Sequence, residues 1–449
     1  MTGRGLQART LLVVAWLASC FLFIYLPDVG RGFISDDFGW ILRSRAGSLD
    51  DVVAWFTRPA MGFYRPLVAL SFAANERLTG LWPMGYALVN VLLALATAAA
   101  IGALVRRLGL PLGSALFGAA LWLFNFHSLR MALMWISGRT SLLAALFAAL
   151  AGLAYARGRP LAVGALTLCA LLSKEEPALL PLIFLSWAVV DRLISEPPAV
   201  QRSFSVAAGM AASSAIGLMV YLALRVPTSA MTPASAPEYY KFTISPSIVG
   251  ANALSYLDRS MTLAALVLTL GWLLFSRKPI ALTSDEKRVA LKGLAWLILG
   301  FGVTVWVPVR SSLYVCFPAI GASLIGAAIG AAVWRTIPVS RMRVAAASLL
   351  ILPLALTPVY RSRNARTRAE AELATHVINV VRDRTAQHPD VQRIVLYDNT
   401  SQPPPVSSSF NWALPEAMEL TVGHAVEVDL RLGTPRATDD RALAIEIRN

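Results

Sequence analysis

Long uncharged apolar runs, separated by short arginine-rich loops, constrain this chain more than any other feature. About 20 apolar residues in a helix cross the hydrocarbon core of a bilayer. Lipid offers no hydrogen bonds to the backbone, so each run must be helical. Only 15% of the 449 residues are charged, against about 25% in a typical soluble protein. The sequence therefore predicts a polytopic integral membrane protein.

The apolar runs predict about eleven transmembrane helices. The first run follows Arg4 and Arg9 and lacks a small-residue cleavage site after it, so we interpret it as an uncleaved span and not a signal peptide. The expected spans cover residues of about 11–27, 84–105, 110–126, 138–156, 160–173, 177–194, 204–224, 252–275, 290–308, 312–333 and 343–360.

The basic loops predict the orientation of these spans. If the N-terminus is cytoplasmic, five short basic loops all fall on the inner face, as the positive-inside rule requires; they contain Arg106, Arg157, Arg192, Lys278 and Arg341. The same frame puts a long loop, about 28–80, on the outer face. The net charge of +14 is thus explained by topology, and membrane lipid rather than nucleic acid is the expected partner.

The tail from residue 361 has a different composition and, with an odd number of spans, also falls outside. Residues 366–384 have helical periodicity, while 394–397 and 425–430 resemble strands. The expected fold is an all-α polytopic membrane domain, 1–360, followed by a small α+β extramembrane domain, 361–449.

Two adjacent carboxylates, Asp36 and Asp37, lie in the long outer loop. Negative charges this close repel, so the pKa of one should be raised unless a cation relieves it. That state suits a general base or a metal ligand, and the sequence leaves open whether a divalent metal binds there. The alternative is an ordinary turn or helix N-cap, where Asp is favoured.

Further polar residues are expected on the same outer face, and ionisable groups at membrane depth are costly and often functional. Each alone could be structural, but together they predict a cavity with carboxylates and several cations: Tyr64, Arg65, His127, Arg139, Lys174, Glu175 and Arg310. Arginine and lysine at a membrane surface suit a phosphate whose lipid tail stays in the bilayer. A carboxylate beside them could deprotonate an acceptor hydroxyl. The reaction indicated is sugar transfer from a polyprenyl-phosphate-linked donor, with the cations stabilising the leaving phosphate.

The order of these motifs resembles the GT-C superfamily of membrane glycosyltransferases over residues 10–330. The motifs are Asp36-Asp37, Tyr64-Arg65-Pro66-Leu67, His127, Trp135-Ile136-Ser137-Gly138-Arg139, Ser173-Lys174-Glu175 and Arg310…Leu313-Tyr314…Pro318. The pattern is most similar to the membrane half of TPR-containing protein O-mannosyltransferases and their bacterial relatives.

The resemblance implies an inverting transfer with Asp36 or Asp37 as the base, and Arg65, Lys174 and Arg310 at the donor phosphate. It also implies a bacterial inner membrane, with the site and the tail on the periplasmic face and a glycan or protein as acceptor.

The sequence departs from the family pattern in several places. Leu129, Arg130 and Met131 occupy a stretch where relatives have a second His and an acid, and Ser141 replaces an acid. Tyr86 and Asn90 stand where a His-containing pattern is common. These departures argue against a metal site near His127. The tail has no repeat of about 34 residues, so no TPRs are expected.

Two other function classes remain open from the sequence. A transporter or flippase of a lipid-linked sugar would use the same cations, although transporters commonly show two related halves, which this chain lacks. A non-catalytic membrane scaffold would account for the replaced motif residues.

Overall fold

The computed structural model describes residues 3–194, 200–232, 234–400, 403–434 and 442–448. Within these residues, nine helical stretches are long and apolar enough to cross a membrane. They contain α1 Gly3–Tyr25, α5 Pro83–Arg107, α8 Arg139–Ala156, α10 Leu180–Ile194, α11 Val200–Arg225, α12 Pro246–Phe275, α13 Ser284–Gly300, α14 Ala319–Thr336, and α15 Val339–Ala355 followed by α16 Thr357–Thr385. The chain is therefore an integral, multi-pass membrane protein.

The other two expected spans are helices of different form. Helices α6, Leu112–Leu123, and α7, Ser128–Met134, make one broken span with a bend of 57°. Helix α9, Pro160–Leu171, has 12 residues, or about 18 Å at 1.5 Å per residue. That is shorter than the bilayer core of about 30 Å. The prediction of about eleven helical segments is confirmed, although two of them are bent or short.

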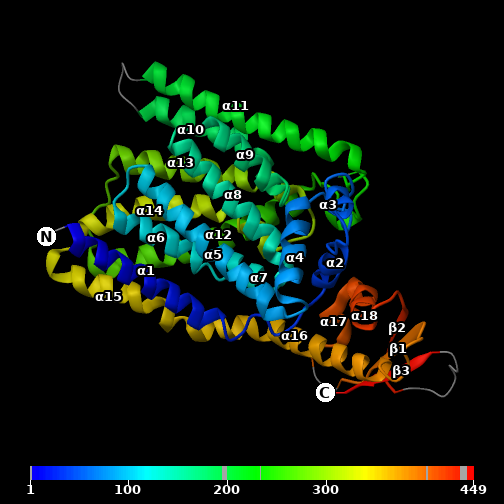
Figure 1. Cartoon of the computed structure of the whole chain (residues 1–449). Helices are drawn as coiled ribbons and strands as arrows, with labels where there is room; N and C mark the ends of the chain where they lie inside the picture. The colour runs from blue at the N-terminus through cyan, green and yellow to red at the C-terminus, as the bar shows by residue number, and fades with distance from the viewer. Residues whose placement is uncertain (1–2, 195–199, 233, 401–402, 435–441, 449) are drawn as a thin grey trace.

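Helix α8 is the most enclosed of the spans, and in Figure 1 it lies inside the bundle. Its most apolar window is 83% buried, against 17% for α12. Ala144, Ala145, Ala148 and Ala149 are fully buried along it. Small side chains let helix backbones approach closely in a membrane, so this alanine-rich sequence makes α8 the central helix, packed against α5 and α9.

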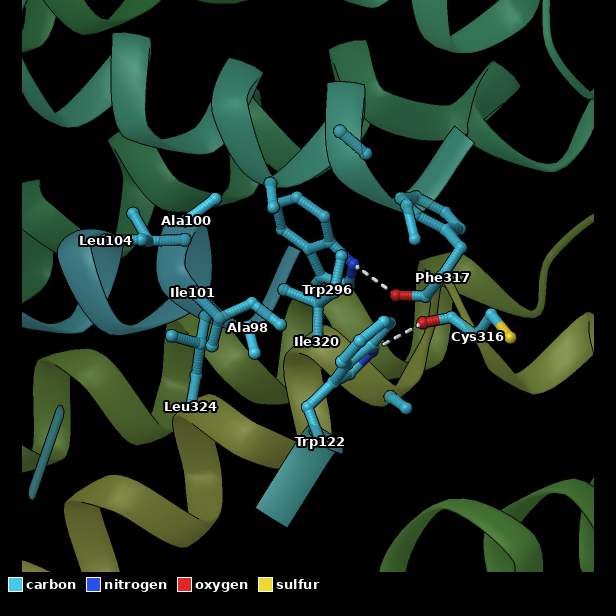
Figure 2. Close-up of a cluster of buried hydrophobic side chains, with 14 of the residues drawn as sticks. Ala98, Ala100, Ile101, Leu104, Trp122, Trp296, Cys316, Phe317, Ile320 and Leu324 are labelled. Carbon is cyan, nitrogen blue, oxygen red and sulfur yellow. Dashed lines mark hydrogen bonds between the residues drawn. The ribbon is translucent and has the colours of Figure 1, made fainter. Parts of the chain in front are cut away.

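Two buried tryptophans fix the start of α14. Figure 2 shows Trp122 of α6 and Trp296 of α13 donating indole N–H groups to the carbonyls of Cys316 and Phe317, each at 3.0 Å. Buried carbonyls need hydrogen-bond partners, and these two sit in an apolar cluster that offers few others. The indoles therefore hold the segment between η6, Ser312–Val315, and α14 in one position.

Short elements cluster at one end of the bundle, which we call the first-loop face because it carries residues 28–80. The helices there are α2 Asp36–Arg43, α3 Leu49–Ala54 and α4 Pro66–Thr79. The 3-10 turns are η1 Ile136–Gly138, η2 Glu176–Leu179, η3 Val226–Thr228, η4 Glu238–Tyr240, η5 Thr304–Trp306 and η6. The end where α5, α8 and α10 finish is the opposite face.

The tail forms the expected small domain of helices and strands. Strands β1 Arg393–Asp398, β2 Glu427–Leu432 and β3 Leu443–Ile447 form a sheet of order β2-β1-β3 in which both pairings are parallel. Parallel strands need a crossover connection, and α17 Val406–Phe410, η7 Asn411–Ala413 and α18 Leu414–Val422 lie between β1 and β2.

Helix α16 begins in the membrane domain and runs into the tail (Figure 1). Buried Asp28 of the first loop accepts hydrogen bonds from Asn364 at 2.9 Å and from Arg368 at 3.0 Å. The rings of Phe38 in α2 and Phe410 in α17 stack at 5.5 Å. The tail therefore lies on the same face as the first loop, as an odd number of crossings requires.

Candidate functional site

The adjacent carboxylates have different surroundings because α2 begins at Asp36. Asp37 is fully buried and accepts hydrogen bonds from the Ile34 N–H at 3.0 Å, the Ser137 N–H at 2.7 Å and the Ser137 hydroxyl at 2.5 Å. Burial raises the pKa of Asp37 to about 7, although these bonds oppose the shift. With both oxygens engaged, Asp37 fastens α2 to η1.

Asp36 remains partly exposed. The Ser35 hydroxyl donates to it at 3.2 Å, and the Trp412 indole of the tail also hydrogen-bonds it. Burial raises the pKa of Asp36, although these bonds and the nearby charge of Arg65 pull it down. A carboxyl group that is accessible and has a raised pKa suits proton transfer. Of the two, Asp36 is therefore the better candidate for a base.

Four more charged side chains lie on the first-loop face, and one of them, Arg65, is close enough to Asp36 for their charges to interact. Arg65, just before α4, forms an ion pair with Glu175 at 2.7 Å, and Lys174 pairs with Glu176 at 2.5 Å. Lys174 also donates to the Ser141 hydroxyl at 2.7 Å. Together with Asp36 we call these residues the ionic cluster. It joins α2, α4 and the turn after α9, which are distant in sequence.

The acid Glu175 is held ionised by Arg65. Burial raises the pKa of Glu175, but the charge of Arg65 and its hydrogen bonds outweigh burial and leave the pKa below its ordinary value. Aromatic rings cover both cations: the Arg65 guanidinium carbon lies 4.0 Å from the Phe63 ring centroid, and the Lys174 nitrogen 5.0 Å from that of Tyr314. The ionic cluster is therefore partly shielded from water.

Two arginines near the start of η6 bind neutral partners. Arg310 is exposed and donates to the side-chain oxygen of buried Asn252 at 2.7 Å. Arg259 of α12 donates to the Ser312 hydroxyl at 3.2 Å. Neither arginine has an ion pair with an acid in the described part of the chain. Their positive charge is therefore available to an anionic ligand.

Three other residues expected at the site occupy different positions. Arg139 is fully buried and donates to Asn90, Asn75 and the carbonyls of Ser71 and Tyr86. Tyr64 is also buried, with its hydroxyl bonded to the carbonyl of Phe56 at 3.1 Å. His127 is half-buried at the bend between α6 and α7, with its ring 4.5 Å from that of Phe126. The structure thus brings together Asp36, Arg65, Lys174 and Glu175, and places Arg139 and Tyr64 in internal bonds.

Sequence reasoning missed two residues of this region. Arg259 lies beside Asp258 within an expected apolar span, and charges at such a depth are a signal of function. Trp412 follows a Pro- and Ser-rich stretch in the tail and is 53% exposed. Its sequence context gives no sign that it meets Asp36, because that contact depends on how the tail packs against α2.

The geometry does not fit a metal ion at Asp36 and Asp37. Both Asp37 oxygens already accept hydrogen bonds from buried donors. Among the residues that the structure describes, no group of three or more His, Cys, Asp or Glu side chains could hold a metal ion. No step of the chemistry proposed below therefore passes through a metal.

Comparisons with known proteins give a limited result. No family model matches the chain, and no curated protein matches it. The structure is partly similar to crystal structures of ArnT from Cupriavidus metallidurans. The structure of ArnT bound to undecaprenyl phosphate is 14% identical, with a TM-score of 0.46 over 93% of this chain and 86% of that one. The apo structure is 13% identical, with a TM-score of 0.46 over 98% and 90%. A likeness of this degree establishes neither a family nor an activity.

Proposed function

We propose that this protein is an inverting GT-C-type glycosyltransferase that moves a sugar from a polyprenyl-phosphate-linked donor to an acceptor hydroxyl. The observation that carries the proposal is Asp36, a partly exposed carboxyl with a raised pKa in a cluster with Arg65, at the membrane face where Arg259 and Arg310 carry unpaired charge. The proposed location is the periplasmic face of a bacterial inner membrane, because the basic loops lie at the opposite face.

Asp36 is the proposed base, and Asp37 is the residue that positions it. The acceptor oxygen bonds to the anomeric carbon as its proton passes to Asp36. The bond between that carbon and the phosphate oxygen breaks, and the electron pair leaves with the polyprenyl phosphate. A single displacement of this kind inverts the anomeric centre.

Arg310 and Arg259 are the proposed contacts of the donor phosphate, since charge develops on that group as it leaves. Lys174 and Arg65 lie close by, but each already has a carboxylate partner. In this proposal they hold the ionic cluster in shape around Asp36. Trp412 brings the tail domain, proposed as residues 361–449, to the acceptor side of the base.

Donor turnover in nanodiscs tests the proposal. Purified protein is given radiolabelled polyprenyl-phosphate sugars and a membrane glycan extract as acceptor, and release of polyprenyl phosphate is measured. We expect Asp36→Asn to lose turnover by at least about a hundredfold, since a positioned general base contributes about 10²–10⁴-fold. Asp50→Asn, in the exposed first turn of α3, is the matched control and should keep the wild-type rate.

The outcomes separate the alternatives. Full turnover by a folded Asp36→Asn variant would refute the role of Asp36. Donor that crosses the bilayer of sealed proteoliposomes without being consumed would favour a transporter or flippase. Binding without turnover or movement would favour a non-catalytic scaffold.

A further inference from the structure

A polar cavity lies at the opposite face, away from the ionic cluster. Its volume is about 300 Å³, and its charged and polar lining comes from the ends or starts of four helices, α5, α8, α10 and α13: Arg107, Tyr155, Asp191, Arg288 and Lys292. Asp191 lies 15 residues beyond Glu176 of the ionic cluster, mostly through α10, which corresponds to about 22 Å at 1.5 Å per residue. The cavity is therefore separate from the proposed active site.

The lining of this cavity has a surplus of positive charge. Lys292 is buried and pairs with both oxygens of Asp191, at 2.7 and 2.9 Å. Arg288 is 3.8 Å from Asp191 and 3.2 Å from the exposed Asp285 of its own helix. Arg107 is exposed and has no ion pair within the described ranges. Since Lys292 neutralises Asp191, the arginines attract an anion.

Two buried polar groups of the lining lack hydrogen-bond partners. The Tyr155 hydroxyl and the Nε–H of Arg288 are buried and unbonded in the described structure. The carboxylate of Asp191 is 3.8 Å from Arg288 Nε, beyond hydrogen-bond length. Leaving such groups unpaired costs free energy, so native proteins usually satisfy them. An anion with several acceptor oxygens would bond to both groups.

We propose that this cavity binds the anionic phosphate of a lipid headgroup. Arginine is suited to phosphate because its planar fork donates two parallel hydrogen bonds. The cavity lies where the apolar helices end, and the ends of spanning helices reach the headgroup region of a bilayer. Val206 and Met210 of α11 also line it, and Val206 is 56% exposed, so acyl chains would continue along this apolar side. A free phosphate shares the same recognition chemistry, and the experiment separates the two sources.

Ligand titrations of the full-length protein in detergent test this site, with the thermal midpoint as readout. The ligands are short-chain phosphatidylglycerol, short-chain phosphatidylcholine and inorganic phosphate. We expect phosphatidylglycerol to bind saturably, and Arg288→Gln to weaken that binding about tenfold, as loss of a charge-assisted hydrogen bond implies. Arg277→Gln, which removes one exposed positive charge at the same face, should leave the affinity unchanged.

A second variant guards against misfolding. Tyr155→Phe keeps every charge and removes only a hydroxyl without a protein partner, so we expect an unchanged midpoint without ligand and phosphatidylglycerol binding several-fold weaker. Equal weakening by Arg277→Gln, or no effect of Arg288→Gln and Tyr155→Phe, would overturn the site. Equally tight, variant-sensitive binding of inorganic phosphate would overturn the lipid source and support the phosphate site. None of these outcomes depends on glycosyl transfer.

Discussion

Replacing Arg139 by lysine should strongly destabilise the membrane domain, because Arg139 connects three helices. Arg139 is the first residue of α8, and its side chain donates hydrogen bonds to Asn90 of α5 at 2.9 Å and to Asn75 of α4 at 2.8 Å. It also donates to the carbonyls of Ser71 at 3.1 Å and Tyr86 at 2.9 Å. All four bonds come from a guanidinium that is fully buried.

The magnitude follows from the acceptors that the variant would leave unpaired. A compact ammonium has three donors and no planar fork, so at least one or two of the four acceptors lose their partner. Each buried unsatisfied group costs about 1–3 kcal/mol, and the total should be about 2–5 kcal/mol. Thermal unfolding in nanodiscs measures it, with Arg157→Lys at the exposed C-terminal end of α8 as control. Equal midpoints for Arg139→Lys and the control would refute the reasoning.

Three further predictions follow from the same contacts. Asp28→Ala should destabilise the junction of α16 with the first loop by about 2–3 kcal/mol, because it leaves the buried Asn364 amide unbonded; hydrogen exchange of α16 measures this, and Arg366→Ala on the exposed side of that helix should change little. The pKa of Asp37 is raised to about 7, so the folded state holds a proton that the unfolded state releases above about pH 4; stability should be lost as pH rises from 4 to 7, by up to about 4 kcal/mol. Asp37→Asn should flatten that profile in denaturation measured at several pH values, and a profile parallel to wild type would contradict the assignment. Arg310→Gln should lower the kcat/KM for the donor about tenfold, because the variant loses a charge-assisted contact with the leaving phosphate; an unchanged kcat/KM for a folded variant would exclude that contact.

The membrane architecture could be predicted from the sequence because it depends on local hydropathy. Each apolar run must satisfy its own backbone bonds, so length and charge are sufficient to predict where helices lie. The short α9 and the bend after α6 are harder to predict. The length of α9 is limited by Pro160 at its start and Lys174 after it. The bend after α6 depends on Asn125, whose side-chain oxygen accepts hydrogen bonds from the N–H groups of His127 and Ser128.

The site was only partly predictable, because similar residue types take different roles in three dimensions. Asp36 and Asp37 are adjacent in sequence and of the same type. At the start of α2, however, Asp36 hydrogen-bonds Trp412 of the tail, whereas Asp37 accepts a hydrogen bond from Ser137. Arg139 and Arg310 both lie at the end of an apolar run, but only Arg139 meets side-chain and carbonyl acceptors from two other helices, α4 and α5. Tertiary packing makes these distinctions, and no local pattern encodes them.

The pairing of charges indicates which cations of the first-loop face are structural and which bind ligand. Separating Lys174 from Glu176 would leave a buried charge uncompensated, which costs about 3–5 kcal/mol in proteins; both side chains are at most 5% exposed. A phosphate would therefore bind more favourably to Arg310 and Arg259 than to Lys174, because the partners of the two arginines are a neutral amide and a hydroxyl. Paired cations therefore suit a fixed framework around Asp36, and unpaired cations suit the exchange of an anionic ligand at each turnover.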